Sequence, residues 1–466
     1  MTQLVYLGIG VTLLFAMSLI LSRGDFFSPS LIVCAIFLLS VIFAIRDVIV
    51  WKVPERIFTF KATIILLLGV FTFVTAEQFT KVLVDAFYKT TIGVANKRKP
   101  NVEVSMVAIH PQGFKKGLML CMVFLLTSFY CYETYKYSRA NGYTGGFDFT
   151  AIATFRHANV FDAQNRVETS RFYRFSKYII DANVFIALWF FINNVFGAKE
   201  KIRKNVIYIF VILLSLPTCI INSSRGFILQ ILGCAVLMVY VTLRRRTGWK
   251  HPGKIFGRIL LWSSLTLIVA LALFYFVQAN GLFGRSTNRS LLDHVTMYIG
   301  DPILNFYDFI KSPPEKTIYF GQETFAELNN LLVKLHIRNV KYSVQLEYRT
   351  IQDHSGNIYT FFRRPYHDFG LFGMCVVTWL TSFIFSWFYY ARLYKRIASS
   401  KVDRELILYS YFFYIVYLVP MLCQLCNMIY FGMVYFVLFV WVIYDLLRGS
   451  NVFKIKAKYK QIKFSI

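Results

Sequence analysis

One turn at the start of an apolar run carries most of the chain's concentrated chemistry. It holds two guanidinium groups, an imidazole and a carboxylate, from Arg363, Arg364, His367 and Asp368. Ionisable residues at a membrane boundary are functional candidates, and a carboxylate beside a histidine can deprotonate or orient a hydroxyl group. Alternatively, Asp368 only caps a helix N-terminus and interacts with its dipole. The residues alone leave both interpretations open.

Three further arginines flank other apolar runs. Arg225 lies in Asn222-Ser-Ser-Arg-Gly226, which joins two runs directly, and Arg285 and Arg289 follow a third run. A planar guanidinium suits a phosphate group. Alternatively, Arg225 extends to the lipid headgroups, and the other two stand in a solvated loop. Together the three arginines predict a bound anionic lipid headgroup on one face of the molecule.

The elements that must position these residues are membrane helices. The 466-residue chain is 57% apolar and 16% charged, whereas soluble domains average about 25% charged residues. This composition excludes a disordered chain, a disulfide-rich mini-protein and a soluble enzyme. We expect an all-α polytopic bundle of about 11 spans (11–12), at Leu4–Leu21, Leu31–Ala44, Ala62–Ala76, Gly117–Cys131, Tyr178–Phe196, Val206–Ile221, Phe227–Val241, Ile259–Val277, Phe369–Tyr390, Leu406–Leu422 and Met428–Leu447.

The net charge of +27 has a distribution typical of membrane proteins. Four short segments, 199–204, 244–258, 392–404 and 448–463, hold 21 of the 51 Lys and Arg residues, and each flanks an apolar run. The positive-inside rule places them in the cytoplasm, which argues against a nucleic-acid partner. Eleven spans then place the N-terminus outside. Twelve are the alternative, and residues 78–94 are a candidate interfacial helix.

This topology divides the chain into four parts. Residues 1–279 form the first part of the bundle with an outer loop at 132–177, and residues 280–366 form a large periplasmic loop. The last bundle part spans 367–448, and 449–466 form a basic cytoplasmic tail. In the large loop, Thr324 and Glu327 predict a capping box before a helix, and alternation over 340–349 predicts a strand that pairs with 358–362.

Several kinds of site have no sequence signal. There is no phosphate-binding GxxxxGK[ST] loop and no metal-ligand spacing. The eight cysteines lie in or beside apolar runs, and Cys423 and Cys426 lack a second pair or nearby histidine for a metal site. We therefore expect no cofactor and no metal. A reaction would then require a substrate that is already activated and lipid-linked.

Two short motifs precede the last part of the bundle, Asn357-Ile-Tyr-Thr360 and Tyr366-His-Asp-Phe-Gly370. Together they resemble the N-V-Y-T … D-F-G signature of bacterial oligosaccharide repeat-unit polymerases, the Wzy-type O-antigen polymerase family. The stretch from Tyr298 through Tyr319-Phe-Gly-Gln-Glu-Thr-Phe325 resembles part of its large loop. Ser224-Arg-Gly226 resembles a turn shared with O-antigen ligases, and Phe26-Phe-Ser-Pro29 is also similar.

The resemblance implies a metal-independent, GT-C-like glycosyltransferase of the bacterial inner membrane with its active site on the periplasmic face. Such an enzyme moves a growing glycan from undecaprenyl diphosphate to the non-reducing end of a new lipid-linked unit. Its partners would be undecaprenyl-diphosphate-linked oligosaccharide, as donor and acceptor, membrane lipid and a chain-length regulator protein.

The resemblance also assigns residue roles. Arg225, with Arg285 or Arg289, would hold the diphosphate, and His367 or Asp368 would align or deprotonate the acceptor hydroxyl. A last group would contact the glycan or acceptor: His354, Asn357, Arg363 and Arg364. The His354–Asn357 spacing departs from the ligase pattern, so the base stays unassigned. The alternatives are a flippase for the same lipid-linked sugars and an O-antigen ligase.

Overall fold

The computed structural model describes most of the chain. The described residues are 2–91, 106–160, 170–222, 225–250, 255, 257, 259, 261, 263–264, 290–340, 345–351, 354–396, 399–428 and 430–448. They are almost entirely helical, apart from one short β-hairpin.

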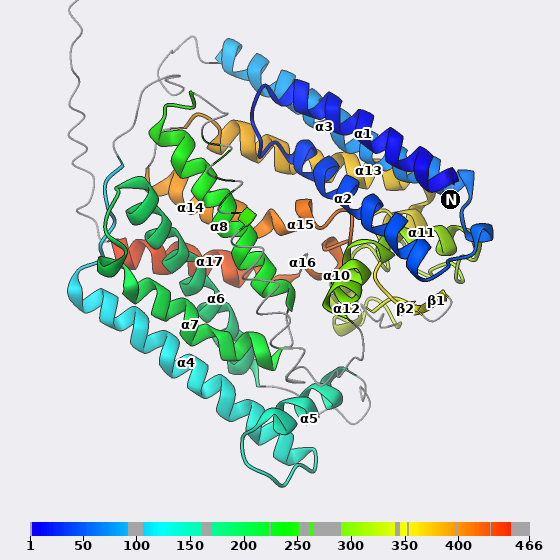
Figure 1. Ribbon diagram of the computed structural model, residues 1–466. Coiled ribbons are helices and arrows are strands. Elements are labelled where there is room, and N and C mark those ends of the chain that lie inside the picture. Colours follow the sequence, from blue (N-terminus) through cyan, green and yellow to red (C-terminus); the bar gives the residue numbers. More distant parts are fainter. Residues whose placement is uncertain are drawn as a thin grey trace, which may run out of the picture.

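The helices form two adjoining groups (Figure 1). The first group packs around α3 and contains α1 (Thr2–Ser22), α2 (Pro29–Val50), α3 (Phe60–Thr91) and α13 (Arg363–Phe388). The second group packs around α6 and contains α4 (Gly113–Ala140), α6 (Arg171–Ile192), α7 (Val206–Ile221), α8 (Arg225–Arg246), α14 (Ser400–Phe412) and α17 (Phe431–Arg448). The short helices α15 (Tyr414–Tyr417) and α16 (Leu425–Met428) lie between the groups.

Short single-turn elements complete these groups. They are η1 (Glu55–Ile57), η2 (Asn193–Gly197), η3 (Ile202–Lys204) and η4 (Tyr389–Leu393), the second and fourth being π-helical extensions of α6 and α13.

Eight described helices are long and apolar enough to cross a membrane, and α7 is a shorter apolar helix. The chain is thus an all-α, multi-pass membrane protein. Of the eleven predicted spans, Ile259–Val277 lies almost wholly outside the described residues. The predicted span Leu406–Leu422 is broken at Phe413 into α14 and α15. Up to Thr91, the segment from Gln78 continues α3 and forms no separate interfacial helix.

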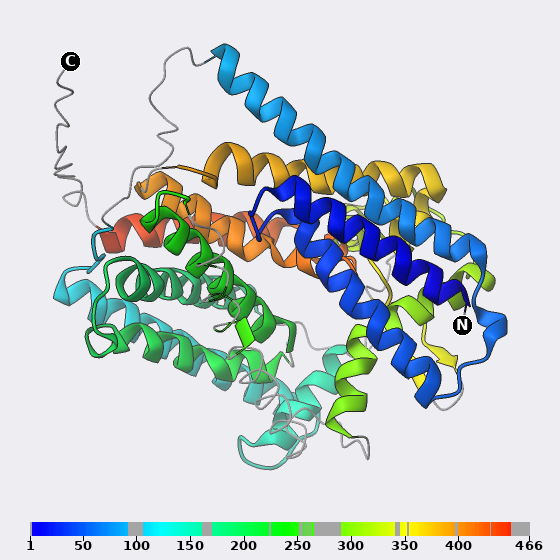
Figure 2. The ribbon, with the colours of Figure 1, turned by 45° about the horizontal axis from the view of Figure 1, so that its top comes forward.

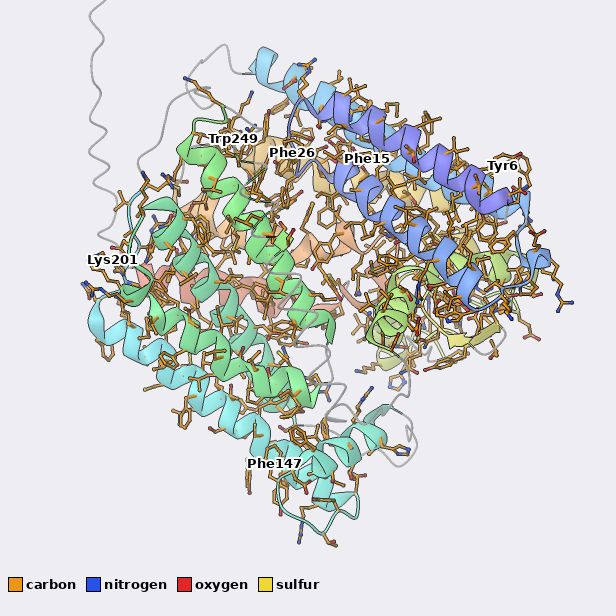
Figure 3. All side chains as sticks on the ribbon, viewed as in Figure 1. Tyr6, Phe15, Phe26, Phe147, Lys201 and Trp249 are labelled. Atoms are coloured by element: carbon orange, nitrogen blue, oxygen red, sulfur yellow. The ribbon has the colours of Figure 1, made fainter. Side chains whose placement is uncertain are left out.

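The two ends of the bundle differ in charge. Lys201 and Trp249 lie toward one end, and Tyr6 and Phe147 lie toward the other (Figure 3). We call the first the basic end, because the loops around residues 200, 246 and 395 gather there. Arg246 donates to the carbonyl of Phe196, which joins two of these loops.

A buried carboxylate organises the basic end. Asp403 on α14 is 3.3 Å from Arg245 at the end of α8 and 3.2 Å from Arg448 at the end of α17. The Tyr444 hydroxyl donates to the same carboxylate. One acidic residue therefore joins the ends of three helices.

The opposite end carries an ordered cap, defined here as the described residues from 290 to 362 (Figures 1 and 2). Its elements are α10 (Leu291–Ile299), α11 (Asp301–Lys311), α12 (Ala326–Lys334), β1 (Arg349–Ile351) and β2 (His354–Gly356). A second projection, α5 (Phe149–Val160), extends beyond α4.

The local predictions for the cap are confirmed only in part. The helix after Thr324 is present, but the capping box is wrong: the residue before α12 is Phe325 and makes no side-chain cap. The hairpin pairs Arg349–Ile351 with His354–Gly356, so its strands are shorter and closer in sequence than 340–349 and 358–362.

Candidate functional site

The first turn of α13 begins with a fully buried arginine. Arg363 pairs with Glu323 from the cap, and its other terminal nitrogen lies 2.7 and 2.9 Å from the two oxygens of Glu347. The guanidinium also lies over the rings of Phe309 and Tyr359, at 4.7 and 5.3 Å from their centroids. A buried arginine is tolerated where carboxylates and aromatic faces replace water. Arg363 therefore fastens the cap to the bundle.

Asp368 lies one turn further along α13 and accepts hydrogen bonds from the cap. The backbone N–H groups of Glu323 and Thr324 donate to it at 3.1 and 2.6 Å, and the Thr317 hydroxyl donates at 3.1 Å. The carboxylate thus binds the backbone N–H groups of the turn at Glu323 and Thr324, which precedes α12, and not those at the N-terminus of α13. In this arrangement Asp368 is a structural acceptor.

His367 lies between these two groups and is buried with them. Its Nδ1 is 3.1 Å from Oε1 of Glu323, and its ring meets that of Phe309 edge-on at 5.9 Å. This contact has the distance of an ion pair but not the geometry of a hydrogen bond. The pair Glu323–His367 thus places a carboxylate beside an imidazole that can accept a proton.

The outer side of this cluster is more accessible. Arg349 lies 3.1 Å from Asp308 and 3.5 Å from Glu347. Burial works to lower the pKa of the Arg349 guanidinium, but its hydrogen bond with Tyr359 and the neighbouring carboxylates outweigh burial and raise that pKa. Burial, followed by the Glu347 charge, raises the pKa of Tyr359. Tyr359 accordingly stays protonated and donates to the Glu347 carbonyl.

Arg364 and its neighbours connect the cap to the middle of the bundle. Arg364 is buried and donates to the carbonyl of Glu323 at 3.0 Å. The backbone N–H of Phe361 donates to the carbonyl of Val419, which follows α15. At the other end of this segment, Tyr414 is the first residue of α15, and its hydroxyl lies against Gly226 at the start of α8. The segment that contains α15 therefore bridges the cap and the α7–α8 turn.

A second ionic pair stands beside the α7–α8 turn. Lys177 on α6 pairs with Asp181 one turn later, and its ammonium lies 4.1 Å from the ring centroid of Phe227. Across the turn, the Tyr130 hydroxyl donates to Asn222 at 3.0 Å. Lys177 is therefore a partly buried cation that lies against Phe227 on α8, two residues after Arg225, which the sequence predicts to bind the diphosphate.

The structure places only some of the predicted site residues. Arg363, Arg364, His367 and Asp368 come together at one end of the molecule, and Asn357 is half-buried between β2 and α13. Arg225 begins α8 and His354 begins β2, but their side chains lie outside the described residues. Arg285 and Arg289 lie wholly outside them, so the predicted gathering of arginines stays a prediction.

Sequence reasoning missed Glu323, Glu347, Arg349 and Lys177. The first three lie 14 to 40 residues before Arg363 along the chain, and no local spacing connects them to it. Lys177 had a usable signal, because a lysine four residues before an aspartate within an apolar run is a helical ion pair.

Comparison with known proteins adds no relative. No family model, curated protein or solved structure matches the chain. Within the described parts of the chain, no group of three His, Cys, Asp or Glu side chains could hold a metal ion.

Proposed function

We propose that this protein is a polymerase of lipid-linked oligosaccharide repeat units. It would transfer a growing glycan from undecaprenyl diphosphate to the non-reducing end of a new lipid-linked unit. The observation that carries the proposal is the ordered cap, fastened by buried ion pairs to the end of the bundle opposite the basic loops. By the positive-inside rule that end faces the periplasm of a bacterial inner membrane.

The leaving group sets the electrostatic requirement. As the glycosidic bond breaks, negative charge develops on the diphosphate, and fixed cations in a partly dry site stabilise that charge without reorganising. Arg225 at the start of α8 would bind the diphosphate, with Arg285 or Arg289 as the second cation. Lys177 lies at the same turn beside Phe227, and its charge is balanced by Asp181, so the site would rely on the arginines for its net positive charge.

Proton transfer would fall to His367. Both oxygens of Asp368 already accept hydrogen bonds from the cap, whereas the His367 ring has the Glu323 carboxylate 3.1 Å from its Nδ1. The imidazole would accept the proton of the acceptor hydroxyl as that oxygen bonds to the anomeric carbon. The bond from the anomeric carbon to the diphosphate would break, with undecaprenyl diphosphate as the leaving group.

Two of the buried acidic residues, Glu77 and Asp181, give the flippase alternative little support. Glu77 on α3 accepts from Ser28 and from the backbone N–H of Ser30, so it caps the start of α2. Asp181 pairs with Lys177 on its own helix. Both carboxylates therefore have structural roles close by.

The test is polymerisation by purified protein in liposomes supplied with undecaprenyl-diphosphate-linked repeat units. We expect a ladder of long glycans that persists in EDTA, and Arg225→Ala should reduce it at least tenfold. Arg203→Ala is the matched control, because Arg203 is an exposed arginine at the basic end. Products of one unit only, or dependence on a divalent ion, would contradict the proposal.

A further inference from the structure

An exposed apolar group stands where the cap meets α13. We call Ile318, Phe320, Leu371 and Phe372 the apolar tip. Phe320 and Phe372 are 81% and 83% exposed, and Ile318 is 72% exposed. Contiguous exposed apolar side chains mark contact surfaces. The apolar tip is therefore a candidate contact surface.

The cap loop is held firmly in this position. Asp368 accepts from the hydroxyl of Thr317 and from the backbone of Glu323 and Thr324, on both sides of the tip's loop. The ring of Phe320 packs on that of Phe369, at 4.5 Å between centroids. The exposed rings are thus part of an ordered surface joined to α13.

The tip continues the outward face of α13. Phe372, Val376, Leu380 and Ile384 are all exposed and recur every four residues, so they lie on one helix face. α13 is long and apolar enough to span a membrane, and two thirds of its most apolar window is not buried in the protein. The surface that touches lipid along α13 therefore extends onto the cap loop.

Helix length gives the depth of the tip. Arg392 follows α13 at the basic end and marks one boundary of the hydrocarbon. About 20 helical residues, or roughly 30 Å, cross that layer. Counting back from Arg392 reaches Phe372, and Phe369 comes just before it along the chain, on the other side of a break in the helix at Gly370. Phe320 against Phe369 then stands at the headgroup level, where aromatic side chains concentrate in membrane proteins.

Nearby cations fit the same depth. Lys316 is exposed two residues before Ile318. Arg338 lies over the ring of Tyr319 at 4.9 Å and donates to the carbonyl of Phe320 at 3.4 Å. Positive side chains beside an apolar tip complement lipid phosphates.

We propose that the apolar tip inserts into the outer-leaflet interface and is covered by bilayer lipid. The loop from 317 to 325 is then a membrane-seated part of the cap, which fixes the height of Glu323 and His367 above the hydrocarbon. The inference does not depend on the chemistry that the site performs.

Site-specific photo-crosslinking tests it. The photoreactive residue p-benzoylphenylalanine replaces one aromatic residue at a time, at position 320, 372 or 147, in full-length protein in phosphatidylglycerol–phosphatidylethanolamine nanodiscs. Phe147 is the matched control, because it is an exposed phenylalanine in the loop between α4 and α5 (Figure 3). After illumination, mass spectrometry of the intact protein detects lipid adducts.

We expect lipid adducts at 320 and 372, with at least fivefold lower yield at 147. Absence of a lipid adduct at 320, or equal yield at 320 and 147, would overturn the proposal. A second measurement, of thermal stability, tests the proposal even if a variant with the photoreactive residue fails to fold. Phe320→Asp should lower the melting temperature in nanodiscs by several degrees more than Phe147→Asp does, and equal shifts would also overturn it.

Discussion

At the scale of single residues, Arg363 is the side chain that joins the cap to α13. It is fully buried between two carboxylates from different parts of the cap and two aromatic rings. Removing one partner of a buried ion pair leaves the other charge uncompensated. The cap's attachment should accordingly be more sensitive to Arg363 than to any exposed arginine.

We predict that Arg363→Ala lowers the free energy of unfolding by about 3–5 kcal/mol, because Glu323 then stays buried without its cation. Thermal unfolding in detergent or nanodiscs measures this. Arg349→Ala serves as the control, since its partners Asp308 and Glu347 are partly exposed and such pairs contribute about 1 kcal/mol or less. Equal losses for the two variants would show that Arg363 is not the fastening residue.

The sequence predicted the members of this cluster that lie on α13, but not the two carboxylates that the cap contributes. Arg363, Arg364, His367 and Asp368 are adjacent, so their convergence follows from the helix itself. Glu323 and Glu347 reach Arg363 through the folding of the cap, and such non-local pairing leaves no periodic signal. The alternative hypothesis that Asp368 caps its own helix is wrong, because the backbone groups it accepts from belong to the cap and not to α13.

At the scale of elements, the close approach of α15 to α8 depends on a glycine. A Cβ on Gly226 would collide with the hydroxyl of Tyr414, which is a buried side chain. The Ser-Arg-Gly turn therefore has a steric reason for its glycine. That reason is separate from any role for Arg225.

We predict that Gly226→Ala destabilises the protein by about 1–3 kcal/mol, the usual range for overpacking. Tyr414→Phe removes the colliding oxygen, so adding it to Gly226→Ala should restore at least half of the loss. Melting temperatures of the two single variants and the double variant provide the measurement. Additive losses in the double variant would contradict the proposed collision.

Hydropathy located elements better than it located their ends. The predicted Val206–Ile221 coincides with α7, because a strongly polar loop precedes it and the Asn222 turn follows it. α3 continues well past the predicted Ala76, since Glu77 and Lys81 are satisfied by each other and by neighbouring helices. A local hydropathy window counts those two charges, but it contains no information about the groups that pair with them, so it ends the predicted span too early. The break at Phe413 falls inside a continuous apolar run, so hydropathy carries no signal for it.

At the scale of the whole molecule, the basic loops and the cap occupy opposite ends (Figure 2). The positive-inside rule predicts that Phe147 and the cap face the outer side of the membrane and that Lys201 faces the cytoplasm. This orientation is the premise of the proposed periplasmic reaction.

We predict that a membrane-impermeant thiol reagent labels Phe147→Cys in intact spheroplasts at least fivefold more than Lys201→Cys. The unaltered chain supplies the background, because Cys121 is exposed. After lysis both positions should react alike, which controls for intrinsic accessibility. Labelling of position 201 alone in intact spheroplasts would reverse the orientation and with it the proposed side of catalysis.

The carboxylate of Asp403 has a practical consequence for protein production. Its two arginine neighbours come from the last turns of α8 and α17, and Arg448 is the final described residue. A truncation ahead of Arg448 would deprive the buried acid of one cation and loosen three helices at once. Affinity tags and shortened versions should therefore retain Arg448.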